Sequence, residues 1–301
     1  MVVERLNRRH ARVKLPKLGW VKFRLSRSLD DVVLRSATLT RDGTHWFVSF
    51  LVDDGQDTPA AHAVPGTAVG VDRGVVVAIA TSDGELLDRR LLTPGEQDRM
   101  ARLQRQLSRC GRRGSNRDRI RAALAEIRGR ERRRRQDFCA QSAHYLASAN
   151  AVVVLEELKI QQMSRSAKGT LQQPGKNVRA KSGLNRAILA KGWHQFALAL
   201  SSVARYTGTT VVTVPAQHTS QRCSACGQVD PKSRESQAVF RCTTCSHAGH
   251  ADVNAARNIL AAGLAVAACE DPVRPSGRAQ SLQQEPAGNR EELLLQPHTA
   301  A

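Results

Sequence analysis

The chain has 301 residues, 41% of them apolar, and carries 46 Lys and Arg against 27 Asp and Glu, a formal charge of +19. This length and apolar content predict about two domains with a buried core and exclude a fully disordered chain. So strong a positive charge is typical of proteins that bind a polyanion, most often nucleic acid. Aromatic residues reach only 4%, which argues against a binder that stacks single-stranded bases. The apolar runs are of strand length, so neither a membrane-spanning helix nor a membrane partner is expected.

The N-terminal region is predicted to consist of β-strands. Residues 20–25 and 36–41 alternate apolar and polar side chains, Asp42-Gly43 predicts a turn, and residues 45–51 form a further strand. Polar residues 53–65 predict a linker between domains. A second hairpin is expected after this linker, from strands at 68–72 and 75–81 that are separated by Gly74.

Two helices with a strong positive charge are predicted between residues 96 and 149. The span 96–135 contains fifteen Arg, no Lys and five acidic residues, a net charge of +10. A solvated helix face is the alternative, but such faces mix charges of both signs, so a surface that contacts phosphates is favoured. The residues expected to contact nucleic acid are Arg112, Arg113, Arg117, Arg132, Arg133, Arg134 and Arg135.

The second half of the chain alternates strands and helices. Residues 151–155 predict a buried strand, the polar residues 162–181 a mobile loop, and 209–214 another strand. Leu189, Trp193, Phe196, Leu200 and Val203 share one face of a predicted amphipathic helix. A last helix is expected from Asp252, with Gly263 as its C-cap. Beyond it the composition predicts disorder.

Four cysteines have the spacing of a zinc site. Cys223-x2-Cys226 is followed after fifteen residues by Cys242-x2-Cys245, and two such pairs surround one tetrahedral Zn²⁺. His247 and His250 follow closely, but four cysteines already saturate the ion, so both are expected to be surface residues. Cys110, Cys139 and Cys269 fit no ligand pattern and are expected to be free thiols.

Three acidic residues have positions that suit catalysis. Asp72 interrupts an apolar strand, Glu156 ends another, and Asp252 begins a helix. Each has an ordinary explanation, because Asp72 can pair with an arginine, Glu156 can mark a strand end, and Asp252 can be an N-cap. Together they meet the demand of two-metal phosphodiester hydrolysis, in which several carboxylates hold Mg²⁺ or Mn²⁺ ions ~4 Å apart. Asp72 is expected to bridge both ions.

Other enzyme classes lack their motifs. The sequence contains no Gly-x4-Gly-Lys-Ser/Thr loop, no Gly-x-Ser-x-Gly elbow and no Gly-x-Gly-x-x-Gly turn after a strand. These absences argue against a P-loop ATPase, a serine hydrolase of the α/β type and a dinucleotide-dependent enzyme.

Several motifs in order resemble the TnpB/OrfB family of insertion-sequence proteins, which are related to type V CRISPR nucleases. They are Gly70-Val-Asp72-Arg-Gly74, Val154-Leu-Glu156-Glu-Leu158, Thr219-Ser-Gln-Arg-Cys223-Ser-Ala-Cys226, Cys242-Thr-Thr-Cys245 and Asp252-Val-Asn-Ala-Ala-Arg-Asn-Ile259. The family has a Glu-Asp-Leu-like motif at the second position, so Glu156 rather than Glu157 aligns with its catalytic residue.

The resemblance implies an α/β fold with an RNase H-like (RuvC) core, an inserted zinc ribbon and a preceding partial β-barrel, or wedge. It implies catalytic roles for Asp72, Glu156 and Asp252 with Mg²⁺ or Mn²⁺, and structural Zn²⁺ on the four cysteines. The implied domains are a wedge-like region at 1–64, the nuclease core at 65–217, the ribbon at 218–249, a final core segment at 250–263 and a disordered tail at 264–301.

The resemblance also implies the partners, which are DNA and a guide RNA from the transposon end, and a location at the bacterial nucleoid in the cytoplasm. It further implies that roughly the first third of the usual family architecture is missing, through a degraded gene copy or a misplaced start codon. A nucleic-acid-binding remnant or repressor without cleavage is the main alternative function. A structural zinc-ribbon module would explain the cysteines but not the acids.

Overall fold

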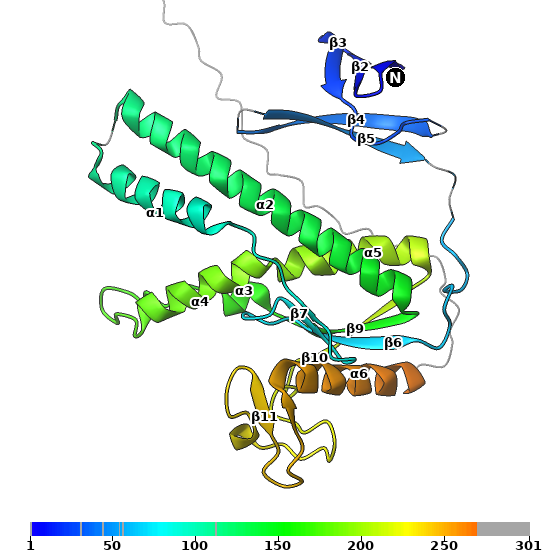
Figure 1. Cartoon of the computed structure of the whole chain (residues 1–301), viewed down its shortest axis with the longest axis vertical. Helices are drawn as coiled ribbons and strands as arrows, with labels where there is room; N and C mark the ends of the chain where they lie inside the picture. The colour runs from blue at the N-terminus through cyan, green and yellow to red at the C-terminus, as the bar shows by residue number, and fades with distance from the viewer. Residues whose placement is uncertain are drawn as a thin grey trace, which may run out of the picture.

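The structure is a computed structural model with a mixed α/β fold (Figure 1). It describes residues 2–269 apart from five positions: Asp31, Thr44, Asp54, Gln56 and Arg112. Arg112, which the sequence predicts to contact nucleic acid, and residues 270–301, which it predicts to be disordered, lie outside the described residues. No helix in the described part of the chain is both long and apolar enough to cross a membrane.

A five-stranded sheet forms the centre of the molecule. Its strands lie in the order β10 (Thr210–Pro215), β9 (Val152–Glu157), β6 (Ala68–Asp72), β7 (Ile79–Thr81) and β8 (Leu86–Leu87). The first three strands are parallel, and β7 and β8 continue the sheet antiparallel from β6. The predicted strands at 68–72, 151–155 and 209–214 are confirmed, whereas β8 was not predicted.

Helices cover both faces of this sheet. Helices α2 (Ser115–Ala149) and α5 (Trp193–Thr207) pack on one face, and α6 (Ala251–Cys269) lies along the other (Figure 1). Val69 and Val71 point into the core under α2 and α5. Gly70 faces α6, because a Cβ atom there would lie 2.1 Å from the Ala256 carbonyl oxygen. Since side chains alternate along a strand, Asp72 points to the α6 face as well.

The predicted helical hairpin is confirmed as α1 (Pro94–Arg109) and α2. Helix α1 begins with a capping box in which Thr93 and Glu96 exchange hydrogen bonds with each other's backbone N–H groups. Arg134 of α2 donates to both carboxylate oxygens of Glu96, at 2.6 and 3.3 Å. One charged residue thus caps α1 and joins it to α2.

Two predictions about the helices after β9 are wrong. The helix expected to carry both Leu189 and Trp193 is two helices, α4 (Val178–Lys191) and α5, because Gly192 adopts φ 73° between them. Leu189 therefore lies on α4, where it is 57% exposed. The expected loop at 162–181 also contains the end of α3 (Ile160–Met163) and the start of α4.

The N-terminal region contains two small antiparallel sheets. Strands β1 (Val2–Asn7), β2 (His10–Leu15) and β3 (Gly19–Arg24) form one, and β4 (Val33–Asp42) and β5 (His45–Asp53) form the other. Strands β1 and β2 were not predicted. Phe23 and Phe50 make contact between the sheets, with ring centroids 5.4 Å apart. No strand pairing joins the two sheets in the described residues, so they do not form one continuous barrel wall there.

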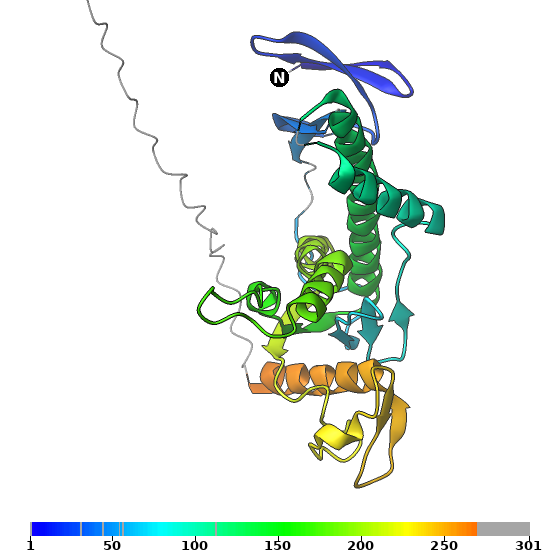
Figure 2. The same ribbon diagram turned by 90° about the vertical axis from the view of Figure 1, so that its left-hand side faces the viewer.

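The cysteine-bearing segment forms a small lobe between β10 and α6. It contains the 3-10 turn Pro231–Ser233 and the antiparallel pair β11 (Val239–Arg241) and β12 (Ala248–His250). The lobe lies against α6 at the end of the molecule opposite the N-terminal sheets (Figures 1 and 2). Helix α6 continues to Cys269, so the predicted end at Gly263 is wrong. Gly263 is instead a packing position, where a Cβ atom would lie 2.4 Å from Val154 Cγ1.

Candidate functional site

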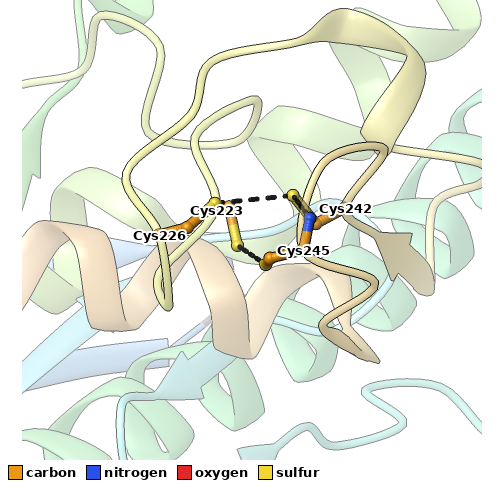
Figure 3. A group of neighbouring side chains, drawn as sticks. All are labelled: Cys223, Cys226, Cys242 and Cys245. Carbon is orange, nitrogen blue, oxygen red and sulfur yellow. Dashed lines mark hydrogen bonds between the residues drawn. The ribbon is translucent and has the colours of Figure 1, made fainter.

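The four predicted zinc ligands come together in the structure. In the described part of the chain, one group of three or more His, Cys, Asp or Glu residues has ligand atoms all within 4.8 Å of one another: Cys223, Cys226, Cys242 and Cys245 (Figure 3). Their sulfur atoms lie 3.7 Å apart for Cys223 and Cys245 and 3.6 Å apart for Cys226 and Cys242. A tetrahedral ion with Zn–S bonds of ~2.3 Å requires sulfur atoms about 3.8 Å apart. The cluster therefore has the dimensions of a Zn²⁺ site.

Two matching turns hold these cysteines. Gly227 N–H donates to the Cys223 carbonyl at 2.9 Å, and Ser246 N–H donates to the Cys242 carbonyl at 3.2 Å. Both residues have positive φ, 76° at Gly227 and 60° at Ser246. The backbone N–H groups of Cys245 and Thr244 also point at the Cys242 sulfur and lower the pKa of that thiol to about 6. Such a turn favours the thiolate form that binds metal.

The other cysteines and the nearby histidines are not part of the cluster. Cys110 and Cys139 are free, as predicted, whereas the Cys269 side chain is not described. His250 lies next to Asp252 and accepts a hydrogen bond from its backbone N–H at 3.3 Å.

The strand register explains how the three acids approach one another. Gly70 of β6 pairs with Val154 of β9, so Asp72 and Glu156 follow two residues later at the same edge of the sheet. Val154 packs against α6, and the alternation along β9 turns Glu156 to the same face. Asp252 lies in the first turn of α6, above this edge. Three segments distant in sequence thus direct carboxylates into one region.

The electrostatics of Asp72 reflect this crowding. Burial, together with the negative charges of Glu156 and Asp252, raises the pKa of Asp72 to about 8. A hydrogen bond with Glu156 adds to the rise in the pKa of Asp72, and burial raises the pKa of Glu156 as well. Glu156 and Asp252 are only 7% and 6% exposed. Buried carboxylates that repel one another form a donor set of hard oxygens that a divalent cation would neutralise.

Gly74 leaves space for this cluster. A Cβ atom at Gly74 would lie 2.6 Å from the Val77 carbonyl oxygen and 3.4 Å from the Asp252 Oδ2 atom. The glycine in the Asp72-Arg73-Gly74 sequence therefore allows both a tight backbone turn and the close approach of Asp252. The fit of glycine here is consistent with a site that gathers carboxylates, although they are less tightly grouped than the cysteines.

Arg234 links the cysteine lobe to the acids. Its Nη2 atom donates to the Asp252 Oδ1 atom at 3.0 Å. Its positive charge also offsets a small part of the rise in the pKa of Asp72. The amides of Asn254 and Asn258 fix the lobe from the other side, since each donates to the Arg222 carbonyl at 2.7 Å. Sequence reasoning assigned no role to these residues. The i, i+4 spacing of the two asparagines after Asp252 was the available signal.

Several of the arginines that are predicted to contact phosphates have partners within the protein. Arg117 donates to the backbone carbonyls at the end of α1, Arg134 pairs with Glu96, and Arg135 donates to Gln195 and Ala190 of the neighbouring helices. Arg132 and Arg133 form ion pairs with Asp42 of β4. These arginines all contact other parts of the protein. The sequence does not predict these contacts, because their partners lie on other segments that meet α2 only in the folded chain. Exposed arginines without a hydrogen bond or ion pair in the described residues include Arg99, Arg102, Arg105, Arg109, Arg113, Arg119, Arg121 and Arg128.

Two family models match the chain. The OrfB_IS605 model, described as "Probable transposase", matches residues 49–167, and the Cas12f1-like TNB domain model matches residues 193–259. The second match spans the cysteine cluster and Asp252. A solved structure of a Cas12f1–sgRNA–target DNA complex covers 74% of this chain and 55% of that chain, at 18% identity and a TM-score of 0.43.

Two curated relatives match most of the chain. The candidate RNA-guided DNA endonuclease InsQ of Escherichia coli (strain K12) is 39% identical over 282 residues, 94% of this chain and 69% of the relative. A candidate RNA-guided DNA endonuclease of Streptomyces pristinaespiralis is 33% identical over 261 residues, 83% of this chain and 60% of the relative. The chain thus spans about two thirds of the length of these relatives. On this similarity, the chain belongs to the TnpB/OrfB family of insertion-sequence proteins.

Proposed function

We propose that the chain is a metal-dependent DNA endonuclease of the TnpB type, guided by RNA and associated with an insertion sequence. The observation that carries the proposal is the convergence of Asp72, Glu156 and Asp252 at one edge of the sheet. The names of its curated relatives support the substrate and the RNA guide. We assign residues 65–217 and 250–263 to a RuvC-like core, 218–249 to a zinc ribbon, and 1–64 to a wedge-like region.

In this proposal the three carboxylates hold two Mg²⁺ or Mn²⁺ ions, and Zn²⁺ on the four cysteines is structural. The catalytic ions supply Lewis acidity for the attacking water and the leaving oxygen. Asp72, on the central strand, interacts electrostatically with both of the other acids, so it would hold an ion together with either of them. Arg234 would share Asp252 with a bound cation, and its ion pair with Asp252 links the lobe to the acids. Such a protein would act on DNA at the nucleoid.

The exposed arginines of α1 are the proposed phosphate contacts. Each neutralised phosphate contributes about −0.9 to the slope of log K against log salt on duplex DNA. Replacing Arg102 and Arg105 by Gln is therefore expected to flatten this slope by about 2, whereas Arg134→Gln leaves it unchanged. A slope that the replacement of Arg102 and Arg105 leaves at the wild-type value would exclude these α1 arginines from the binding surface.

The nuclease proposal is tested on circular single-stranded DNA with zinc-loaded protein, with and without RNA co-purified from cells that carry the insertion sequence. Cleavage is expected with Mg²⁺ or Mn²⁺ and not without an added ion. Asp72→Asn is expected to abolish it, and Asp83→Asn, in an exposed turn after β7, to preserve it. No cleavage by the wild-type protein under any of these conditions would contradict the proposal. Equal cleavage by Asp72→Asn would contradict the acidic site.

A nucleic-acid-binding protein without cleavage is the second candidate. It is favoured by the Arg234–Asp252 ion pair and by the raised pKa of Asp72, which together reduce the negative charge at the edge of the sheet without a cation. DNA binding that is identical with and without divalent ions, together with no cleavage, would support it.

A further inference from the structure

Arg73 has an unusual position directly after Asp72. The alternation that turns Asp72 toward α6 turns Arg73 toward the opposite face, where Val69 and Val71 of the same strand are buried. Arg73 is only 6% exposed. A guanidinium group therefore lies at the edge of an apolar core, on the reverse side of the sheet from the three acids.

The contacts of Arg73 join three segments. One Nη atom donates to the main-chain carbonyl of Glu156, and the other lies 3.5 Å from the carbonyl of Trp193, the first residue of α5. Trp193 returns a bond, because its indole N–H donates to the Gly74 carbonyl at 3.2 Å. The ends of β6 and β9 and the start of α5 thus form a closed set of contacts around one side chain.

Stability of the core alone does not explain these contacts. Burying a guanidinium group is costly unless all of its donors are satisfied, and apolar residues of similar size often stabilise such sites better. The Arg73 Nε atom is buried without a hydrogen-bond partner, and burial lowers the pKa of the side chain. The arrangement is best explained by the place it gives to Glu156.

We propose that Arg73 is a positioning residue, which holds Glu156 by its main-chain carbonyl and ties the start of α5 to the edge of the metal site. This inference rests on the proposed function only for the consequence for metal binding. Arg73 lies on the opposite face of the sheet from the three carboxylates, so it acts through the direction in which Glu156 presents its carboxylate. Partners that orient metal ligands in this way typically change metal affinity 10- to 100-fold when removed.

The test compares Arg73→Gln and Arg73→Lys with Arg135→Gln in zinc-loaded protein. Arg135 is a matched control, because it also donates to a backbone carbonyl next to α5, that of Ala190, but makes no contact with Glu156. The first measurement is amide hydrogen exchange across residues 152–158 without added divalent ions. Arg73→Gln is expected to speed exchange at the end of β9, Arg73→Lys to speed it less, and Arg135→Gln to leave it unchanged.

The second measurement is Mn²⁺ affinity by electron paramagnetic resonance. Arg73→Gln is expected to weaken it by about tenfold, with partial recovery in Arg73→Lys and no change in Arg135→Gln. If Arg73→Gln does not fold, the same comparison is made between Arg73→Lys and the control. Unchanged exchange and Mn²⁺ affinity in the Arg73 variants would overturn the inference, as would equal losses in Arg135→Gln. If Arg73→Gln alters amide exchange but the wild-type protein binds no Mn²⁺, the positioning role is supported and the proposed metal site is contradicted.

Discussion

The cysteine cluster and the carboxylate cluster are two candidate metal centres built on opposite principles. The cysteines come from two short turns, and their sulfur atoms already have the spacing of a zinc tetrahedron. The carboxylates come from a central strand, a neighbouring strand and a helix, and they repel one another enough to raise the pKa of Asp72 to about 8. The proposed zinc site is thus formed by local geometry, whereas the proposed catalytic site depends on the whole fold and holds its carboxylates together against their mutual repulsion.

The largest expected effect comes from removing one cysteine turn. Cys223→Ser combined with Cys226→Ser should remove one zinc per chain and unfold the lobe. Its core consists of Cys223, Phe240, Cys242 and Ala251 alone, so metal binding supplies most of its folding free energy, of the order of 10 kcal/mol. Elemental analysis and amide exchange measure both losses. Cys110→Ser is the control and should keep its zinc; a double variant with full zinc content would refute the assignment.

The next effect is expected at Asp72. Asp72→Asn should abolish detectable cleavage, a loss of the order of a thousandfold or more, because it removes a carboxylate ligand of the proposed ions. Without added Mg²⁺ or Mn²⁺ the same variant should be more stable than wild type. The raised pKa means that the folded state holds a proton that the unfolded state releases near pH 4, so wild-type stability falls as pH rises from there through about 8. Thermal unfolding between pH 5 and pH 9 checks this prediction. If the melting temperatures of wild type and Asp72→Asn change equally with pH, the crowding of the acids is contradicted.

Arg234 tests the connection between the two centres. Arg234→Gln leaves the nearly buried Asp252 without its ion pair, so we expect a loss of about 1–3 kcal/mol in the absence of Mg²⁺ and Mn²⁺. Added Mn²⁺ should recover most of this loss by taking the place of the guanidinium group. Urea unfolding of zinc-loaded protein measures both. A loss that Mn²⁺ does not recover would mean that Arg234 only supports the lobe.

The smallest expected effect is at Glu96, whose pKa shift has the opposite sign to that of Asp72. Hydrogen bonds from Arg134 and the Thr93 backbone lower the pKa of Glu96 to about 2. Its contribution to stability is therefore present above its ordinary pKa of 4.5 and lost as the pH falls toward 2. Glu96→Gln should lower the melting temperature at pH 7 and have little effect near pH 2. If the melting temperatures of wild type and Glu96→Gln differ equally at pH 7 and pH 2, the charge of Glu96 is not the cause of the stabilisation.

Local patterns predicted the parts of the site that depend on short spacings. The two cysteine pairs, the strands that carry Asp72 and Glu156, and the helix that carries Asp252 all follow from neighbouring residues. The register between β6 and β9, which turns both acids to the α6 face, is a long-range property. The sequence could therefore predict that these acids converge, but not the strand register that turns Asp72 and Glu156 to the same face.

The errors have physical causes of the same kind. The apolar period continues from Leu189 through Trp193, and only the left-handed backbone at Gly192 ends one helix and starts another. Glycine favours helix ends, so Gly263 predicts a C-cap, but in the structure its missing side chain makes room for Val154. The arginine partners were unpredictable because Glu96 and Asp42 reach α2 only in the folded chain.

The position of Asp252 on α6 has a consequence for protein synthesis. Asp72 and Asp252 are about 180 residues apart, so at a translation rate of 5–20 residues per second the third acid emerges roughly 9–36 s after the first. Until then β6 and β9 present an uncovered apolar face, and α6 closes it only when Gly70 and Gly263 meet their partners. A nascent chain on the ribosome therefore has an incomplete set of acids, and the proposed nuclease site cannot form until α6 has been made and docked.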